Sequence, residues 1–158
     1  MSRLYKQSLN SVQRKIGKAL HLLYEKDHFL ITNGTEERST THKLAEYIQQ
    51  LFIEWNVDCE YNRRGEYRPK AIGSKKTSYP DIIIHRRNTK KNLLVIEAKS
   101  IHSRKHGDVG DKNKIKAYIE DPDYQYQFGL WICFHDDPAD NRLDWFENND
   151  GNWREITL

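Results

Sequence analysis

The sequence predicts a single α/β domain over residues 1–158, with a mixed central β-sheet of about four to five strands flanked by helices. The length of 158 residues suits one domain with a substantial core. From Thr35 onward, the apolar patterns follow the order helix, strand, strand, strand, helix, strand. Three successive strands followed by a helical crossover produce a sheet with both antiparallel and parallel neighbours.

Two helices are expected before the first strand. Apolar residues recur at helical spacing from Leu9, which predicts an N-terminal helix over residues 8–25. The run "HFLIT" follows, and "TNG" then breaks the chain. The second helix begins near Thr35, and its core stripe comprises Leu44, Ile48, Leu51 or Phe52, and Trp55.

The three strands that follow are short. "VDCEYN" (57–62) alternates apolar and polar residues, which predicts a half-buried strand. "RRGEYRPKAIGSKK" (63–76) is basic and interrupted by Gly and Pro, so a loop or a frayed hairpin is expected. "PDIIIH" (80–85) and "NLLVIEAK" (92–99) are apolar strands joined by a basic turn.

The last core elements are a helix and a strand. "DKNKIKAYIE" (111–120) predicts a short helix, and "YQFGLWICFH" (126–135) predicts a strongly apolar strand. The core therefore spans residues 35–134. The remaining segment, 135–158, is acidic and rich in turn residues, and we expect it to fold back onto the body through Trp145, Phe146 and Trp153.

The composition favours a cytoplasmic protein. Apolar runs are shorter than the ~20 residues that a membrane span needs, and the basic N-terminus lacks an apolar signal core. Cys59 and Cys133 lie far apart in apolar runs, which excludes a disulfide framework and a paired-cysteine zinc site.

The net charge of +3 hides an asymmetry along the chain. Residues 1–119 carry 24 Lys and Arg against 13 Asp and Glu, whereas residues 120–158 carry 2 against 10. A basic body with an acidic C-terminal segment favours a face that binds a polyanion. A solvated, charge-balanced surface is the alternative.

Three charged residues stand in the apolar hairpin, namely Asp81, Glu97 and Lys99. Because residues two apart share a face of a strand, Glu97 and Lys99 point the same way. If the two strands pair antiparallel, Asp81 at the start of one lies near Glu97 and Lys99 at the end of the other. Two carboxylates then converge at one edge of the sheet.

Converging carboxylates repel, so one is protonated unless a cation lies between them. Oxygen ligands without His or Cys nearby favour magnesium or manganese. Lys99 beside the cation could orient a water or stabilise negative charge on a phosphate, which suits phosphodiester hydrolysis. The alternative is that Asp81 caps a turn after Pro80, while Glu97 and Lys99 form a surface ion pair.

The pattern Pro80-Asp81, fifteen residues, then Glu97-Ala98-Lys99 resembles the PD-(D/E)xK nuclease superfamily, which has the restriction endonuclease-like fold. The resemblance covers about Thr35 to Phe134, including the order of the elements. It implies that Asp81, Glu97 and the backbone carbonyl of Ala98 bind Mg²⁺ or Mn²⁺, and that Lys99 assists the attacking water.

Many members of that superfamily supply a further Glu from the helix before the sheet. Glu37 is seven residues before Leu44 and shares its helical stripe, so it faces the sheet and becomes the fourth candidate for catalysis and metal binding. The alternative is that Glu37 only stabilises the helix dipole.

The candidate nucleic-acid contacts are basic residues and one aromatic residue. Lys114 and Tyr118 have the spacing of a Q-x-x-x-Y motif in exonuclease-type members of the superfamily, with Lys in place of Gln. They could contact a phosphate and stack on a base. The basic loop adds salt-dependent phosphate contacts through Arg63, Arg64, Lys75 and Lys76.

The sequence thus favours a metal-dependent nuclease, most simply a DNA endonuclease, and leaves DNA versus RNA open. The resemblance also leaves open a homodimer that cuts both strands. The rivals are a nucleic-acid-binding module without cleavage and a protein-interaction domain whose acidic segment contacts a partner. In the last case, deletion of residues 136–158 would remove partner binding.

Overall fold

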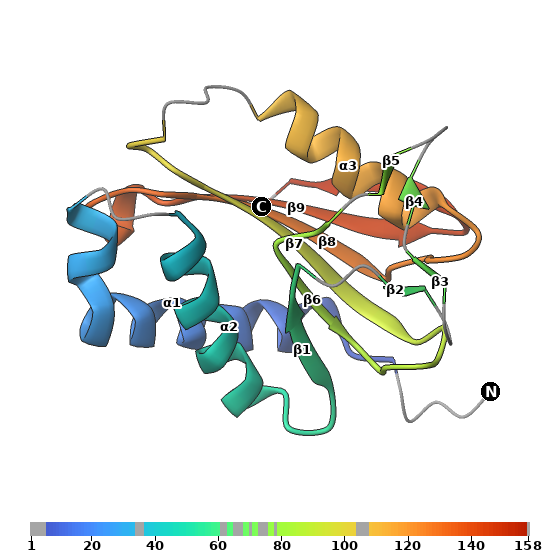
Figure 1. Cartoon of the computed structure of the whole chain (residues 1–158), viewed down its shortest axis with the longest axis horizontal. Coiled ribbons are helices and arrows are strands. Elements are labelled where there is room, and N and C mark those ends of the chain that lie inside the picture. Colours follow the sequence, from blue (N-terminus) through green and yellow to red (C-terminus); the bar gives the residue numbers. More distant parts are fainter. Residues whose placement is uncertain are drawn as a thin grey trace.

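The computed structural model describes residues 6–33, 37–60, 63–64, 68–69, 71–72, 76–77, 79–103 and 108–157 (Figure 1). The helices are α1 (Leu9–Thr32), α2 (Glu37–Leu51) and α3 (Val109–Glu120), with a short 3-10 helix η2 (Pro138–Asp140). The main sheet contains β1 (Asn56–Cys59), β6 (Ile82–His85), β7 (Asn92–Ser100), β8 (Phe128–Phe134), β9 (Arg142–Asn149) and β10 (Asn152–Ile156). The chain is an α/β protein.

The order of elements predicted for the core is confirmed: α2, β1, β6, β7, α3 and β8 follow one another as helix, three strands, helix and strand. In the main sheet the strand order is β1-β6-β7-β8-β9-β10. β1, β6 and β7 form an antiparallel meander, and β8 is parallel to β7 because α3 carries the chain back across the sheet. The sheet is therefore mixed, as expected.

The expected number of four to five strands is wrong, because the main sheet has six. The acidic C-terminal segment, expected only to fold back onto the body, forms β9 and β10 and extends the sheet beyond β8. Trp145 packs in the core on one face, and its neighbour Phe146 packs in the core on the other. A strand that buries residues on both faces shows little alternation in sequence, which explains why it was missed.

The N-terminal helix is longer than the predicted span of 8–25, since α1 continues to Thr32. Asp27 has non-helical dihedral angles (φ −129°, ψ 27°), so the helix is kinked there. The run "HFLIT", expected to lie outside the helix, forms its last turns, in which Ile31 is buried. Burial of Ile31 accounts for the continuation past the kink.

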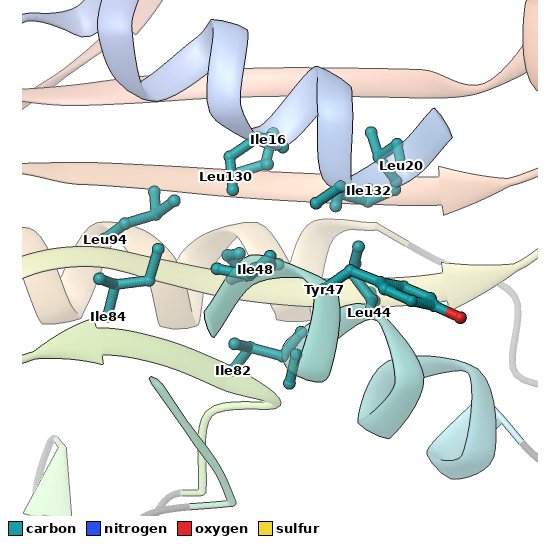
Figure 2. Packing of buried hydrophobic residues seen from close by; sticks show 14 of the residues in the cluster. Ile16, Leu20, Leu44, Tyr47, Ile48, Ile82, Ile84, Leu94, Leu130 and Ile132 are labelled. Atoms are coloured by element: carbon teal, nitrogen blue, oxygen red, sulfur yellow. The ribbon is translucent and has the colours of Figure 1, made fainter. Parts of the chain in front are cut away.

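Helices cover both faces of the sheet, with α1 and α2 on one face and α3 on the other (Figure 1). On the first face, α1 packs over β8 and α2 packs over β6 and β7 (Figure 2); the contacting residues include Ile16, Leu20, Leu44, Ile48, Ile82, Ile84, Leu94, Leu130 and Ile132. The second face has a smaller core comprising Ile83, Val95, Ile115, Tyr118, Ile119, Tyr124, Tyr126, Trp131 and Phe146. Because strand residues alternate between faces, β6 and β7 contribute to both cores.

The basic loop between β1 and β6 was expected to be a loop or a frayed hairpin. Its described residues form two short antiparallel ladders, β2 (Arg63–Arg64) with β3 (Arg68–Pro69), and β4 (Ala71–Ile72) with β5 (Lys76–Thr77). Each ladder has two residues per strand, which agrees with a frayed hairpin.

Two compositional expectations can be compared with the described residues. Cys59 and Cys133 are both free thiols. None of the helices in the described ranges is long and apolar enough to cross a membrane.

Candidate active site

The candidate site lies where β6 begins and β7 ends. Ile82 is paired with Ile96, so the antiparallel register brings Asp81 opposite Glu97. The carboxylate of Asp81 accepts a hydrogen bond from the backbone N–H of Ala98 (2.8 Å). The hairpin therefore brings the two carboxylates together, as the sequence predicts.

Glu97 is buried, with only 3% of its surface exposed. Burial raises the pKa of Glu97 well above its usual value, the nearby Asp81 carboxylate raises it further, and the ammonium of Lys114 opposes both effects. Burial also raises the pKa of Asp81, against the hydrogen bond from Ala98 and the charge of Lys114. Ionisation of both Asp81 and Glu97 is therefore unfavourable unless a cation lies nearby.

Lys114 extends from α3 toward this pair. Its Nζ lies 2.8 Å from Oε1 of Glu97 and donates a hydrogen bond to the carbonyl oxygen of Tyr79 (2.9 Å). The sequence indicated Lys114 as a nucleic-acid contact, whereas the structure places its ammonium against a candidate metal ligand. An amphipathic analysis of α3 could have found this, because Lys114 precedes the buried Tyr118 by one helical turn.

Lys99 lies two residues after Glu97 on the same face of β7. Its Nζ is 3.4 Å from Oδ2 of Asp111 and 4.0 Å from Oε1 of Glu37. Burial by itself would lower the pKa of Lys99, but the two carboxylates outweigh it and the pKa is raised. Lys99 is therefore an ammonium held between two acidic side chains.

Glu37 is the first residue of α2, and it faces the sheet as its spacing from Leu44 predicts. Its Oε2 accepts a hydrogen bond from the backbone N–H of Ser100 (3.2 Å), and its Oε1 faces Lys99. This contact ties the start of α2 to the end of β7. The structure thus places Glu37 beside Lys99, at the edge of the site.

Asp111 is a site residue that the sequence analysis did not identify. It lies in the first turn of α3 and pairs with Lys99. Asp111 precedes the buried residues Ile115 and Tyr118 by four and seven positions, which places all three on one helical face. That spacing was available in the sequence, but a charged residue on a buried face was not expected.

Tyr118 was predicted to contact nucleic acid, and the structure corrects this. Its side chain has no exposed surface, and its ring packs against Tyr124 (centroids 5.2 Å apart) and Tyr126 (5.7 Å). The helical period turns Tyr118 toward the sheet with Ile115. Tyr118 is a core residue, and the Lys-x-x-x-Tyr spacing does not form a surface motif.

The basic loop of residues 63–76 is described only through its backbone pairing, so its side chains are not placed relative to the site. Arg63 and Arg64 form β2, and Lys76 begins β5, but only the backbone pairing of these residues is described. Lys75 lies outside the described residues. Their predicted contacts with nucleic acid remain predictions.

The oxygen ligands at the site decide which cation it could hold. Across the described ranges, no three His, Cys, Asp or Glu side chains are grouped closely enough to hold a metal ion. Mg²⁺, however, usually keeps several waters and takes only one or two carboxylates. Oε1 of Glu97 is buried, and a cation, the ammonium of Lys114, already lies 2.8 Å from it. The Asp81–Glu97 pair therefore suits a two-carboxylate magnesium site, and Glu37 is not part of that group.

A pocket of about 380 Å³ opens beside the pair, between the start of α2 and the end of β1; its lining comprises Glu37, Arg38, Thr41, His42, Cys59, Glu60 and Asp81. The pocket connects two of the candidate site residues, Glu37 and Asp81, to the molecular surface. It provides a route by which a ligand could reach the carboxylates of Glu37 and Asp81.

Comparison with models of known protein families gave no match, and a search of curated proteins found no similar sequence.

Proposed function

We propose that the protein is a metal-dependent nuclease of the PD-(D/E)xK type that hydrolyses phosphodiester bonds, most simply a DNA endonuclease. The observation that supports this best is the pairing of a buried carboxylate, Glu97, with the half-buried carboxylate of Asp81, and the presence of Lys99 on the same face of the strand as Glu97. The mixed sheet, in which β8 returns parallel to β7 after α3, has the element order expected of the restriction endonuclease-like fold.

Asp81, Glu97 and the backbone carbonyl of Ala98 are the groups that would hold Mg²⁺ or Mn²⁺. A divalent cation bound there supplies Lewis-acid activation of the phosphate and of the attacking water. Burial raises the pKa of both Glu97 and the half-buried Asp81, so a cation held by the two carboxylates would offset the cost of keeping them ionised.

Lys99 is the residue that would act on the substrate directly. Its ammonium can stabilise the negative charge that develops on the phosphate oxygens, or orient the attacking water. Asp111 and Glu37 contact the ammonium from two helices, α3 and α2, and so restrict its position. In this role Glu37 and Asp111 are positioning residues.

The charge distribution supports a polyanionic substrate. The segment 1–119 contains 24 Lys and Arg and 13 Asp and Glu, a surplus of 11 positive charges. Such a surplus supplies salt-dependent phosphate contacts without reading sequence. The basic residues of the loop before β6 are close in sequence to Asp81, which would place nucleic acid near the site.

The test is cleavage of supercoiled plasmid, single-stranded DNA and RNA with Mg²⁺, Mn²⁺ or EDTA. Asp81→Asn and Lys99→Ala are compared with two matched controls, Asp140→Asn and Lys90→Ala, which lie in exposed positions outside the site. We expect metal-dependent cleavage that falls by at least about 100-fold in the site variants and persists in the controls. A folded wild-type protein that cuts none of these substrates, or site variants as active as the controls, would refute the proposal.

A nucleic-acid-binding module without cleavage is the second candidate. Two lysines, Lys114 and Lys99, already face the acidic side chains, and the described residues do not assemble a group of three metal ligands. Under this alternative the wild-type protein binds DNA at low salt, with or without EDTA, and does not cut it.

The protein-interaction alternative cannot be tested by the deletion that the sequence suggests. Residues 136–158 contain β9 and β10, and Trp145 and Phe146 belong to the two cores. Removing this segment would expose both cores and unfold the domain, so loss of partner binding would not identify a contact surface.

A further inference from the structure

The ion pair between Lys114 and Glu97 joins a helix residue to a candidate metal ligand. Oε1 of Glu97 is buried and lies 2.8 Å from Nζ of Lys114. The contact joins opposite charges, and the attraction is strengthened by the burial of Glu97, which is 3% exposed. The ammonium of Lys114 therefore stabilises the ionised forms of Asp81 and Glu97.

A divalent cation bound to Glu97 would need the same oxygen. Two cations held at contact distance from one carboxylate oxygen repel each other strongly in a partly buried site. The lysine side chain keeps 28% of its surface exposed, and its long flexible stem allows the ammonium to move into solvent. The cation and the ammonium of Lys114 are thus alternative partners of Glu97.

We propose that Lys114 is an internal counter-ion of the metal-free site, which is exchanged for the divalent cation when the metal binds. The proposal rests on the proposed function, because it requires that Asp81 and Glu97 hold a metal. Lys114 neutralises the pair when no metal is bound, which stabilises the domain, and it lowers the affinity of the site for the metal.

The exchange would also remove a hydrogen bond from the backbone just before Asp81. In the metal-free site, Lys114 donates to the carbonyl oxygen of Tyr79, two residues before Asp81 (2.9 Å). When the ammonium leaves Glu97, it releases this carbonyl and becomes free to contact an anion such as a phosphate of the nucleic acid. Metal binding and phosphate binding would then be linked through one side chain.

The first experiment measures Mn²⁺ binding without nucleic acid at about pH 8, where protons compete least for carboxylate ligands. Lys114→Met keeps the length and the apolar stem of the side chain and removes the charge. Lys116→Met is the matched control. It removes the same charge from the same helix, but Nζ of Lys116 lies over the ring of Trp153 (4.1 Å from its centroid) and not against Glu97. We expect Lys114→Met to bind Mn²⁺ at least about tenfold more tightly than the wild type and the control.

The same proteins give a second readout from thermal unfolding. In EDTA, Lys114→Met should unfold at a lower temperature than the wild type and Lys116→Met, because Glu97 has lost its counter-charge. Saturating Mn²⁺ should raise its Tm by more than that of the other two proteins. A lysine that only supports the structure would lower Tm equally with and without Mn²⁺.

The wild-type protein provides a direct test that does not depend on how the variants fold. Lysine acetylation with a small reagent, mapped by peptide mass spectrometry, reports the accessibility of each ammonium. We expect Mn²⁺ to raise the labelling rate of Lys114 about threefold or more, since the ammonium moves from the ion pair into solvent. The labelling of Lys116 should not change.

The outcomes separate this proposal from the nuclease proposal. If the wild type binds Mn²⁺ and cuts DNA, but the Lys114 labelling is unchanged and Lys114→Met binds Mn²⁺ no more tightly, only the exchange is overturned. If the wild type and both variants bind no Mn²⁺ and the wild type cuts nothing, both proposals fail together.

Discussion

Gly129 of β8 and Ile115 of α3 lie so close that a Cβ atom on Gly129 would be 2.2 Å from Cγ2 of Ile115. A second helix residue, Ile119, would be 3.2 Å from the same Cβ through its Cδ1 atom. The glycine therefore lets α3 pack closely on the sheet. Asp111 and Lys114, which contact Lys99 and Glu97 in the candidate site, are on the same helix.

Replacing Gly129 by alanine should destabilise the protein. The added methyl group overlaps Ile115, which is fully buried, so the Ile115 side chain or the helix that carries it must shift. We expect a loss of about 1–3 kcal/mol in the free energy of unfolding, measured by urea denaturation. Gly17→Ala is the control, since a Cβ there meets nothing within 4 Å and alanine favours a helix. An equal gain in stability from both substitutions would show that the close contact is absent.

A partly buried network of His85, Asp58 and Arg87 at the other end of β6 should make stability depend on pH. Nε2 of His85 lies 2.7 Å from Oδ2 of Asp58, and Nε of Arg87 donates to the same oxygen (2.9 Å). Burial by itself raises the pKa of Asp58, but the contacts with His85 and Arg87 outweigh it and lower the pKa to about 2. His85 is thus a buried residue whose imidazole is partnered by Asp58.

Because the pKa of Asp58 is lower in the folded protein than in the unfolded chain, its ionised form stabilises the fold. This contribution is present above the ordinary pKa of 3.8 and is lost as the pH falls toward 2. Relative to Asp58→Asn, the wild type should be more stable by about 2 kcal/mol near neutral pH. Urea denaturation across pH measures the difference, which should shrink below about pH 4. A difference that stays constant down to about pH 2 would contradict the expectation.

Asp111 should control the protonation of Lys99. Removing its charge by Asp111→Asn takes away the carboxylate that raises the Lys99 pKa most, so that pKa should fall. Nuclear magnetic resonance titration of ¹³C-methylated lysines measures this directly. Asp144→Asn is the control, because Asp144 lies 2.6 Å from Lys112. If both substitutions leave the Lys99 pKa where it is in the wild type, the ion pair with Asp111 is not formed in solution.

Tyr118 should behave as a core residue and not as a nucleic-acid contact. Tyr118→Ala removes a fully buried ring that packs against Tyr124 and Tyr126, so the free energy of unfolding should fall by about 3–5 kcal/mol. Tyr118→Phe keeps the ring and should leave DNA affinity unchanged in a fluorescence anisotropy assay. A large loss of DNA affinity in the folded Tyr118→Phe protein would restore the surface interpretation.

The β6–β7 hairpin and its carboxylates could be predicted from the sequence, because their arrangement depends on local rules. Two apolar strands with a short turn pair antiparallel, and this register brings Asp81 opposite Glu97. The helical period likewise directs Glu37 toward the end of β7. Each of these results needs only the geometry of one element or of two that are adjacent in sequence.

The tertiary structure decided what lies against those carboxylates. Lys114 and Asp111 reach the site because α3 packs across the sheet, closely against Gly129 of β8, and this contact joins segments that are distant in sequence. The burial of Tyr118 and the addition of β9 and β10 depend on the same packing, since apolar residues there are covered from both faces. Sequence periodicity determined which side chains share a face of an element, and only the packing of distant elements determined which charges meet.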